Sequence, residues 1–390
     1  METLHGAKSN ADSKLFEREQ NPRLIAFYLP QYHPIPENDA WWGKGFTEWT
    51  NVTKAKPLFE GHNQPHLPAD LGFYDLRLPE VREAQADLAR KYGIYGFCYY
   101  HYWFNGRRLL ERPFEEVLAS GKPDFPFCLC WANENWTRGW DGAEHQVLVQ
   151  QNYSSEDDRQ HIRWLAQAFA DTRYIRVDGK PVFIVYRTAR LPDPKRTTDI
   201  WRDEARRQGL GELFLVRVET YDIGSDIDPI KIGFDASVEF MPDWRMVASD
   251  RLSLREWWTP WTSALALLRQ DKLAKIRAFE KTSVFQYESI IEKAMARAPA
   301  LYERFRCVSP GWDNHARRPQ GGGHMIVGST PELYGKWLRS VVEDVRTRPV
   351  DHQLLFVNAW NEWGEGNHLE PCRQSGHAYL EATRNALFSE

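Results

Sequence analysis

Cysteine is scarce in this sequence, and long runs of apolar residues are missing. The chain has 5 Cys among 390 residues, an odd number without a C-x-x-C spacing, so reduced, mostly buried thiols are expected rather than a disulfide framework or a zinc knuckle. Residues 1–20 are polar and charged and lack the apolar core of a signal peptide. The sequence therefore predicts a polar leader over residues 1–20, no membrane span and a location in the cytoplasm.

An excess of positive charge and a glycine-rich phosphate loop are also missing. The formal net charge is −4 and the pI is near 6.3, which argues against a nucleic-acid partner. Residues 30–33, which follow the first predicted strand, contain no glycine, unlike the phosphate turn of a doubly wound dinucleotide-binding sheet. No metal and no cofactor are predicted. A metal site needs at least three converging ligands, and no such set stands out in the sequence.

Aromatic residues, in contrast, are abundant. The chain has 17 Trp, 16 Tyr and 20 Phe, which together make up 14% of it. This is more than a core needs, and many of these residues stand beside polar ones, as in residues 131–136. Such a composition is typical of surfaces that stack on flat rings.

Apolar runs with the character of buried strands alternate with segments of helical periodicity. The eight predicted strands cover residues 23–29, 96–100, 125–130, 181–186, 213–218, 236–238, 306–309 and 354–357. Polar and aromatic clusters follow six of these strands, which is where a parallel barrel carries its active site. We therefore predict an α/β protein with a single (β/α)8 TIM-type barrel over residues 21–390. An open doubly wound sheet is the alternative.

Two regions of this pattern are irregular. The segment after the fifth strand is short and only weakly helical. After the sixth strand, a long insertion runs to about residue 282 and carries Trp257, Trp258 and Trp261. This aromatic-rich insertion is either a lid or a plain pair of surface helices.

The strongest catalytic candidates are Glu362 and Glu365, which follow the eighth strand. Side chains at i and i+3 of a strand point to opposite faces, so these two carboxylates can share a cavity only if the chain turns, which Gly364 and Gly366 permit. A paired acid and base is what cleavage or transfer of a glycosidic bond requires. The alternative is that the two acids are solvated or cap a helix.

Candidate sugar-binding residues are the polar and aromatic side chains at or near the predicted strand ends. Aromatic faces can stack on pyranose rings, and acids can accept hydrogen bonds from hydroxyls, although each residue could equally hold its own loop together. Glu134 is also a reserve catalyst by analogy with other barrels. The full set is Tyr28, Gln31, Tyr32, His33, Trp41, Trp42, Glu48, Trp49, Tyr100, His101, Trp103, Trp131, Asn133, Glu134, Trp136, Trp140, Asp141, Glu239, Trp244, Trp312, Asp313, Trp360, Asn361 and Trp363.

Five motifs together resemble the WbsX-type proteins of bacterial surface-polysaccharide loci, which are related to glycoside hydrolase family 99, the endo-α-mannosidases. They are FYLPQYHP at 27–34, GFTEW at 45–49, YYHYWF at 99–104, WANENW at 131–136 and NAWNEWGEG at 358–366. The resemblance implies a retaining mechanism in which Glu362 is the base that deprotonates a sugar 2-hydroxyl and Glu365 is the general acid. The resemblance to the mannosidases does not extend to residues 31–33 or to the Trp41–Trp42 segment.

Three functions follow as expectations. The first is a retaining glycoside hydrolase-like enzyme that acts on bacterial surface or other complex polysaccharide. The second is a retaining glycosyltransferase of O-antigen or lipopolysaccharide assembly, in which Arg187, Arg317 and Arg318 could hold the phosphate of a sugar nucleotide and a lipid-linked glycan could be a partner. The third is a non-catalytic sugar-binding protein, for which the intact Glu pair is unfavourable.

Overall fold

The computed structural model describes residues 21–139, 143–219, 227–252 and 270–388. Eight strands pair in parallel around a closed barrel, and the last of them returns to the first through the register Ile25 to Phe356. In chain order these strands are β1 (Arg23–Tyr28), β2 (Gly96–Phe104), β4 (Phe127–Trp131), β8 (Lys180–Val185), β9 (Phe214–Glu219), β10 (Ala236–Glu239), β12 (Arg304–Val308) and β14 (Leu354–Val357). The predicted (β/α)8 barrel is confirmed.

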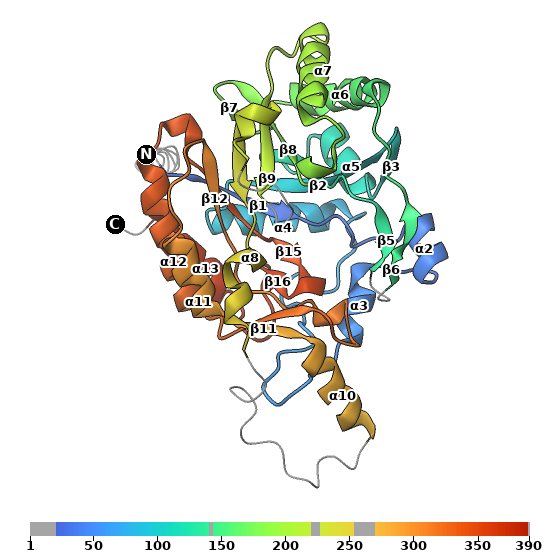
Figure 1. Ribbon diagram of the computed structural model, residues 1–390, viewed down its shortest axis with the longest axis vertical. Helices are drawn as coiled ribbons and strands as arrows, with labels where there is room; N and C mark the ends of the chain where they lie inside the picture. The colour runs from blue at the N-terminus through green and yellow to red at the C-terminus, as the bar shows by residue number, and fades with distance from the viewer. Residues whose placement is uncertain (1–20, 140–142, 220–226, 253–269, 389–390) are drawn as a thin grey trace, which may run out of the picture.

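Helices surround the barrel and connect its strands (Figure 1). They are α4 (Pro79–Lys91), α5 (Arg112–Ser120), α6 (Ser155–Ala170), α7 (Pro194–Arg207), α11 (Tyr287–Met295), α12 (Pro331–Arg346) and α13 (Ala378–Phe388). Between β9 and β10 the described chain forms the short 3-10 helix η3 (Pro229–Ile232). The fifth unit is therefore irregular, as its weak periodicity indicated.

The strands form because their apolar runs are buried on both faces. Every side chain from Val182 to Val185 is fully buried, as in parallel strands that face a barrel interior on one side and helices on the other. Inside the barrel, the ring of Phe27 packs 5.6 Å from those of Phe240 and Phe356 and 5.8 Å from that of Tyr100. These aromatic rings fill the barrel beneath its C-terminal mouth.

Short elements in the loops build the rim of that mouth. They are α2 (Pro36–Trp42), α3 (Glu48–Lys54), β3 (Arg107–Leu109), β5 (Trp136–Arg138), β6 (Ala143–Val149), η2 (Thr188–Arg190), η6 (Asn314–Ala316), β13 (His324–Val327), β15 (Asn361–Glu362), η8 (Trp363–Glu365) and β16 (Asn367–His368). At the opposite end of the barrel lie β7 (Arg176–Val177) and η7 (Val350–His352). The rim elements follow the strands, so they gather at one end of the barrel.

The insertion after β10 is present in part. Its described elements are α8 (Trp244–Val247), η4 (Ala248–Asp250), α10 (Gln270–Lys281) and β11 (Ser283–Gln286), and β11 pairs with β13. Helix α10 lies at the far end of the molecule from α7 (Figure 1). Trp257, Trp258 and Trp261 fall outside the described residues, as does the predicted leader.

All five cysteines are buried and reduced, as predicted. None of the described helices combines the length and the apolar character that crossing a bilayer requires.

Candidate active site

The loop after β14 carries Glu362 and Glu365 on a tight turn between two short antiparallel strands, β15 and β16. Gly366 adopts φ 58°, which favours glycine, and a side chain at Gly364 would collide with the carboxylate of Glu48. Both glycines are therefore needed for the turn. It carries the two carboxylates to the same guanidinium group, that of Arg317.

Arg317 connects carboxylates from two other loops of the rim. Its Nη2 donates to Glu362 Oε2 at 2.9 Å, its Nη1 to Glu365 Oε1 at 2.6 Å, and its Nε to Glu48 Oε1 at 2.9 Å. Glu48 begins α3 in the loop after β1, while Arg317 directly follows η6 in the loop after β12. Three acids thus surround one cation, and the positive charge of the Arg317 guanidinium offsets the repulsion among the three carboxylates.

The electrostatics of this cluster separate the two catalytic candidates from ordinary surface acids. Burial raises the pKa of Glu365 to about 8, against the opposing effect of Arg317, and the nearby Glu362 and Glu48 carboxylates raise it further. Burial also raises the pKa of Glu362, and Arg317 again opposes the shift. A Glu with a pKa near 8 carries its proton at neutral pH, so Glu365 is able to act as a general acid.

The two acids line a cavity of about 230 Å³ at the mouth of the barrel. We call it the inner cavity. Its remaining lining residues are Leu29, Gln31, Tyr100, Tyr102, Ala132, Glu134, Asn135, Trp136, Tyr186, Phe240, Trp312 and Arg317. The wall therefore combines aromatic faces with amide, hydroxyl and carboxyl groups, which is the mixture that sugar rings require.

The structure brings a part of the predicted sugar-binding set to this mouth. Gln31, Tyr100, Glu134, Trp136 and Trp312 line the inner cavity. Trp41 and Trp42 line an adjoining cavity of about 320 Å³, the outer cavity, which also contains Glu365. Trp140 and Asp141 lie outside the described residues.

A second part of the set contacts the turn over residues 361–366, which carries Glu362 and Glu365. The Tyr32 hydroxyl donates to the Asn361 carbonyl at 2.6 Å, and the Asn361 amide exchanges hydrogen bonds with the backbone of Leu29. Trp49 packs its ring 5.6 Å from that of Trp363. These residues and Trp360 are buried, and they support the turn rather than line the inner cavity.

Other predicted residues are not among those that line the inner or the outer cavity. The Tyr28 hydroxyl donates to Gln85 of α4. His101 contacts His161 of α6, and Trp103 donates to Asp157 of the same helix. Trp131 donates to the Trp103 carbonyl, and Asn133 forms hydrogen bonds with the backbone of Arg187. Trp244 packs on His324. His33 is buried.

Glu239 is the clearest departure from the predicted set. Its buried carboxylate pairs with Arg297, Arg304 and Arg306. Residues of a strand alternate between two faces. Glu239 falls on the face that meets this arginine cluster, so the structure does not bring it to the inner cavity.

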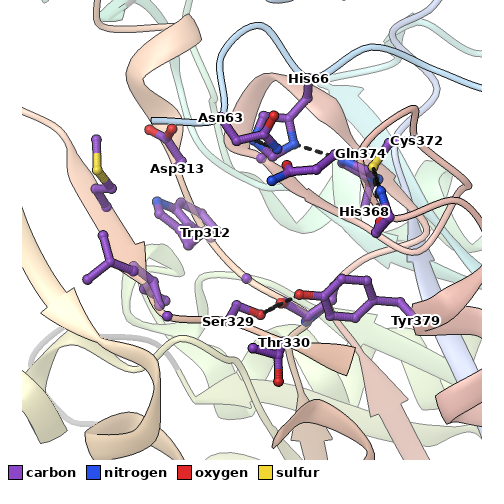
Figure 2. A pocket seen from close by; sticks show the side chains of 18 of the residues that line it. Asn63, His66, Trp312, Asp313, Ser329, Thr330, His368, Cys372, Gln374 and Tyr379 are labelled. Atoms are coloured by element: carbon purple, nitrogen blue, oxygen red, sulfur yellow. Dashed lines mark hydrogen bonds between the residues drawn. The ribbon is translucent and has the colours of Figure 1, made fainter. Parts of the chain in front are cut away.

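Asp313 lies at a different cavity, of about 630 Å³, behind Trp312. We call it the rear cavity. Figure 2 shows Trp312 and Asp313 on one side of it and His66, His368 and Tyr379 on the other. The Asp313 carboxylate accepts from His62 and Gln64, each at 2.6 Å, so its charge is engaged within the loops.

The sequence analysis missed several residues of the site. Tyr102 lies two positions after Tyr100 on the same strand, and the period of two could have found it. Arg317 was considered as a possible phosphate ligand under one alternative function, and its three acidic partners were not foreseen. His62 and His66 stand four residues apart, a metal-like spacing that escaped notice, yet among the described residues no cluster of three metal-ligating side chains occurs.

Glu370 was also missed, and it anchors the turn over residues 361–366 through its hydrogen bond with Trp363. Its carboxylate accepts from Trp363 Nε1 at 2.6 Å, from Gln85 Nε2 at 2.6 Å and from the Tyr74 hydroxyl at 2.8 Å. Burial raises its pKa to about 7. No sequence signal distinguishes this Glu from other acids near the end of the chain.

Solved structures share this architecture. A glycoside hydrolase-like protein matches with a TM-score of 0.57 at 15% identity, over 95% of each chain. The GH99 endo-α-mannosidase from Bacteroides thetaiotaomicron matches with a TM-score of 0.52 at 15% identity, over 93% of this chain and 96% of that one. The fold is therefore that of glycoside hydrolase-like barrels.

The sequence itself matches the model of a protein family, Glycosyltransferase WbsX, over residues 24–383. The chain belongs to this WbsX glycosyltransferase family. Protein WxcX of Xanthomonas campestris pv. campestris, strain B100, is 45% identical over 365 residues, which is 93% of this chain and 49% of the relative. The chain thus spans about half the length of the curated relatives it matches.

Proposed function

We propose that this protein cleaves or transfers glycosidic bonds of a bacterial surface polysaccharide with retention of configuration. Glu362 would be the base and Glu365 the acid. The observation that carries the proposal is the convergence of these two carboxylates on one aromatic-lined cavity at the barrel mouth. Membership of a carbohydrate-active family supports the same conclusion.

The resemblance to family 99 gives the order of events. Glu362 takes the proton of the sugar 2-hydroxyl, and this oxygen attacks the anomeric carbon. The bond to the leaving oxygen breaks, and Glu365 donates its proton to that oxygen, which leaves an anhydro sugar. Glu365 then takes a proton from the incoming water or hydroxyl, whose oxygen attacks the anomeric carbon. The bond between this carbon and the 2-oxygen breaks, and Glu362 returns its proton to the 2-oxygen.

The contacts of the site support this division of labour. Glu365, with a pKa near 8, would hold the proton that the leaving oxygen needs. The charge of Arg317 opposes the burial of the Glu362 carboxylate and so favours the ionised form that a base requires. Removal of either acid would stop the first step.

Hydrolysis and transfer differ in the group that attacks the anomeric carbon. A second candidate function, a retaining glycosyltransferase, is favoured by the family that the chain matches. The guanidinium groups of Arg187 and Arg317 pair with Glu134 and with the three acids, respectively. These pairs make Arg187 and Arg317 poor ligands for a donor phosphate and leave Arg318, which lines the outer cavity, as the remaining one of the three. We therefore favour a glycan over a sugar nucleotide as donor.

The test is turnover by purified protein. Surface-polysaccharide oligosaccharides and nucleotide sugars are incubated with the wild type, Glu362→Gln and Glu365→Gln, and the products are followed by mass spectrometry. We expect the wild type to consume an oligosaccharide and each variant to lose at least about a hundredfold in rate. Glu80→Gln, on the exposed face of α4, is the matched control and should keep the wild-type rate.

Two outcomes would reject the proposal. Undiminished turnover in both Gln variants would remove the acid and base from the mechanism. Sugar binding without turnover in the wild type would instead identify a sugar-binding protein. Consumption of a nucleotide sugar but not of any oligosaccharide would select the transferase.

A further inference from the structure

The outer cavity opens from the inner one and shares part of its wall. Tyr102, Asn135, Trp136 and Glu365 line both of them. Glu362 lines the inner cavity and is not among the described residues that line the outer one. The two catalytic candidates therefore stand in different relations to the two cavities: the base faces one of them, and the acid faces both.

This asymmetry assigns a side of the reaction to each cavity, if the proposed function holds. The sugar whose anomeric carbon reacts must contact both carboxylates, so it belongs in the inner cavity. The leaving oxygen takes its proton from Glu365, so the group attached to that oxygen extends past Glu365 into the outer cavity. In transfer, the acceptor hydroxyl enters by the same path because Glu365 also removes its proton.

Two rim elements provide the indole side chains that line the outer cavity. Helix α2 contributes Trp41 and Trp42, and the β5–β6 hairpin contributes Trp136, whose ring lies 5.9 Å from that of Trp41. The guanidinium of Arg138 lies over the Trp42 ring at 5.3 Å and donates to the Trp41 carbonyl. The indoles are thus held by contacts between the two elements, and each remains partly exposed.

The polar part of the wall includes an amide without a protein partner. Asn38 is fully buried at the outer cavity, and neither its Oδ1 nor its Nδ2 finds a hydrogen-bond partner among the residues that the structure describes. A buried amide left in this way costs stability, and a ligand that pairs with it would offset that cost. Its donor and acceptor match the hydroxyl groups of a sugar.

We propose that the outer cavity binds a saccharide unit on the acid side of the reaction. This unit is the leaving sugar in cleavage and the acceptor sugar in transfer. It stacks on the indoles of Trp42 and Trp136 and bonds to Asn38. A volume of about 320 Å³ is at the lower end of the range for small-molecule sites, which suits a sugar ring better than a nucleoside diphosphate.

Binding is measured directly, so the test does not depend on turnover. Methyl α-D-mannopyranoside, methyl α-D-glucopyranoside and methyl α-L-rhamnopyranoside are the probes, with UDP as the competing class, and saturation-transfer difference NMR reports contact with the protein. We expect at least one glycoside to bind the wild type. Trp42→Ala and Asn38→Ala should weaken its affinity at least about tenfold, while Trp42→Phe should restore most of it.

A matched control and a second readout separate this inference from the proposed function. Tyr95→Ala removes a partly exposed ring at the start of β2, away from both cavities, and should bind the glycoside as the wild type does. If turnover is found, Trp42→Ala should also lower the ratio of transfer to hydrolysis at least about tenfold. Failure of turnover alone counts against the proposed function and leaves the binding result decisive.

The inference is overturned by any of three results. No glycoside binds the wild type, or a glycoside binds with equal affinity to Trp42→Ala and Asn38→Ala. In the third, UDP alone binds and Trp42→Ala abolishes its binding, which would make the outer cavity a nucleotide site.

Discussion

Replacement of Glu365 by Gln should change the stability of the protein in a pH-dependent way. In the folded protein, burial raises the pKa of Glu365 from 4.5 to about 8. Between these two pH values the unfolded chain releases the proton while the folded protein keeps it. Taken alone, the Glu365 carboxyl therefore lowers the stability of the wild type as the pH rises from about 4.5 to about 8, and a neutral Gln at this position removes that contribution.

The size of the effect follows from the shift. At about 1.36 kcal/mol per pKa unit, the rise to about 8 corresponds to about 5 kcal/mol. This figure is an upper limit because 19% of the Glu365 side chain remains exposed and solvent screens its charge. The Gln carbonyl can still accept from Arg317, so we expect the variant to gain about 2 to 4 kcal/mol relative to the wild type between pH 5 and pH 8.

The assay is urea denaturation of both proteins, followed by circular dichroism at half-unit steps from pH 5 to pH 8. The quantity of interest is the difference in the free energy of unfolding between Glu365→Gln and wild type at each pH. Glu80→Gln serves as control and should show a flat difference. A flat difference for Glu365→Gln as well would refute the raised pKa, and with it the argument that Glu365 holds a proton at neutral pH.

Three further predictions concern the surroundings of the two acids. Arg317→Met removes the counter-charge that opposes the effect of burial and should raise the pKa of Glu362 further, so the acidic limb of the pH–rate profile should move to higher pH; an unmoved limb would contradict this. Glu370→Ala leaves three buried donors unpaired and should cost at least about 3 kcal/mol in urea denaturation, whereas Glu370→Gln should cost less. Glu239→Gln should lower the free energy of unfolding by about 3 kcal/mol because it weakens a buried ion pair, yet leave kcat/KM of the folded fraction unchanged, and a selective loss of kcat/KM would return this residue to the site.

The barrel could be predicted because the burial of each strand determines which residues its sequence contains. A strand such as residues 181–186 is buried on both faces and must be continuously apolar. The irregular fifth unit was visible for the same reason, since a short 3-10 turn (Pro229–Ile232) carries no helical period. The local sequence pattern was sufficient to predict an element wherever the structure of that element depends on its own residues.

The site was predictable only where its groups lie on one short segment. Gly364 and Gly366 indicated the turn that carries Glu362 and Glu365. Which face Glu239 occupies depended on arginines about 58 to 67 residues away, and the partners of Arg317 come from two other loops. Such contacts are set by the closure of the barrel, which no local spacing reports.

The most direct test of the central claim, that Glu362 and Glu365 act on one anomeric carbon in two steps, is the stereochemistry of the first product. Once a cleavable oligosaccharide is found, proton NMR of the anomeric signals in the first minutes of reaction shows which anomer forms before mutarotation. We predict the same configuration as in the substrate, and no product at this stage from Glu362→Gln or Glu365→Gln. The inverted anomer would contradict the account.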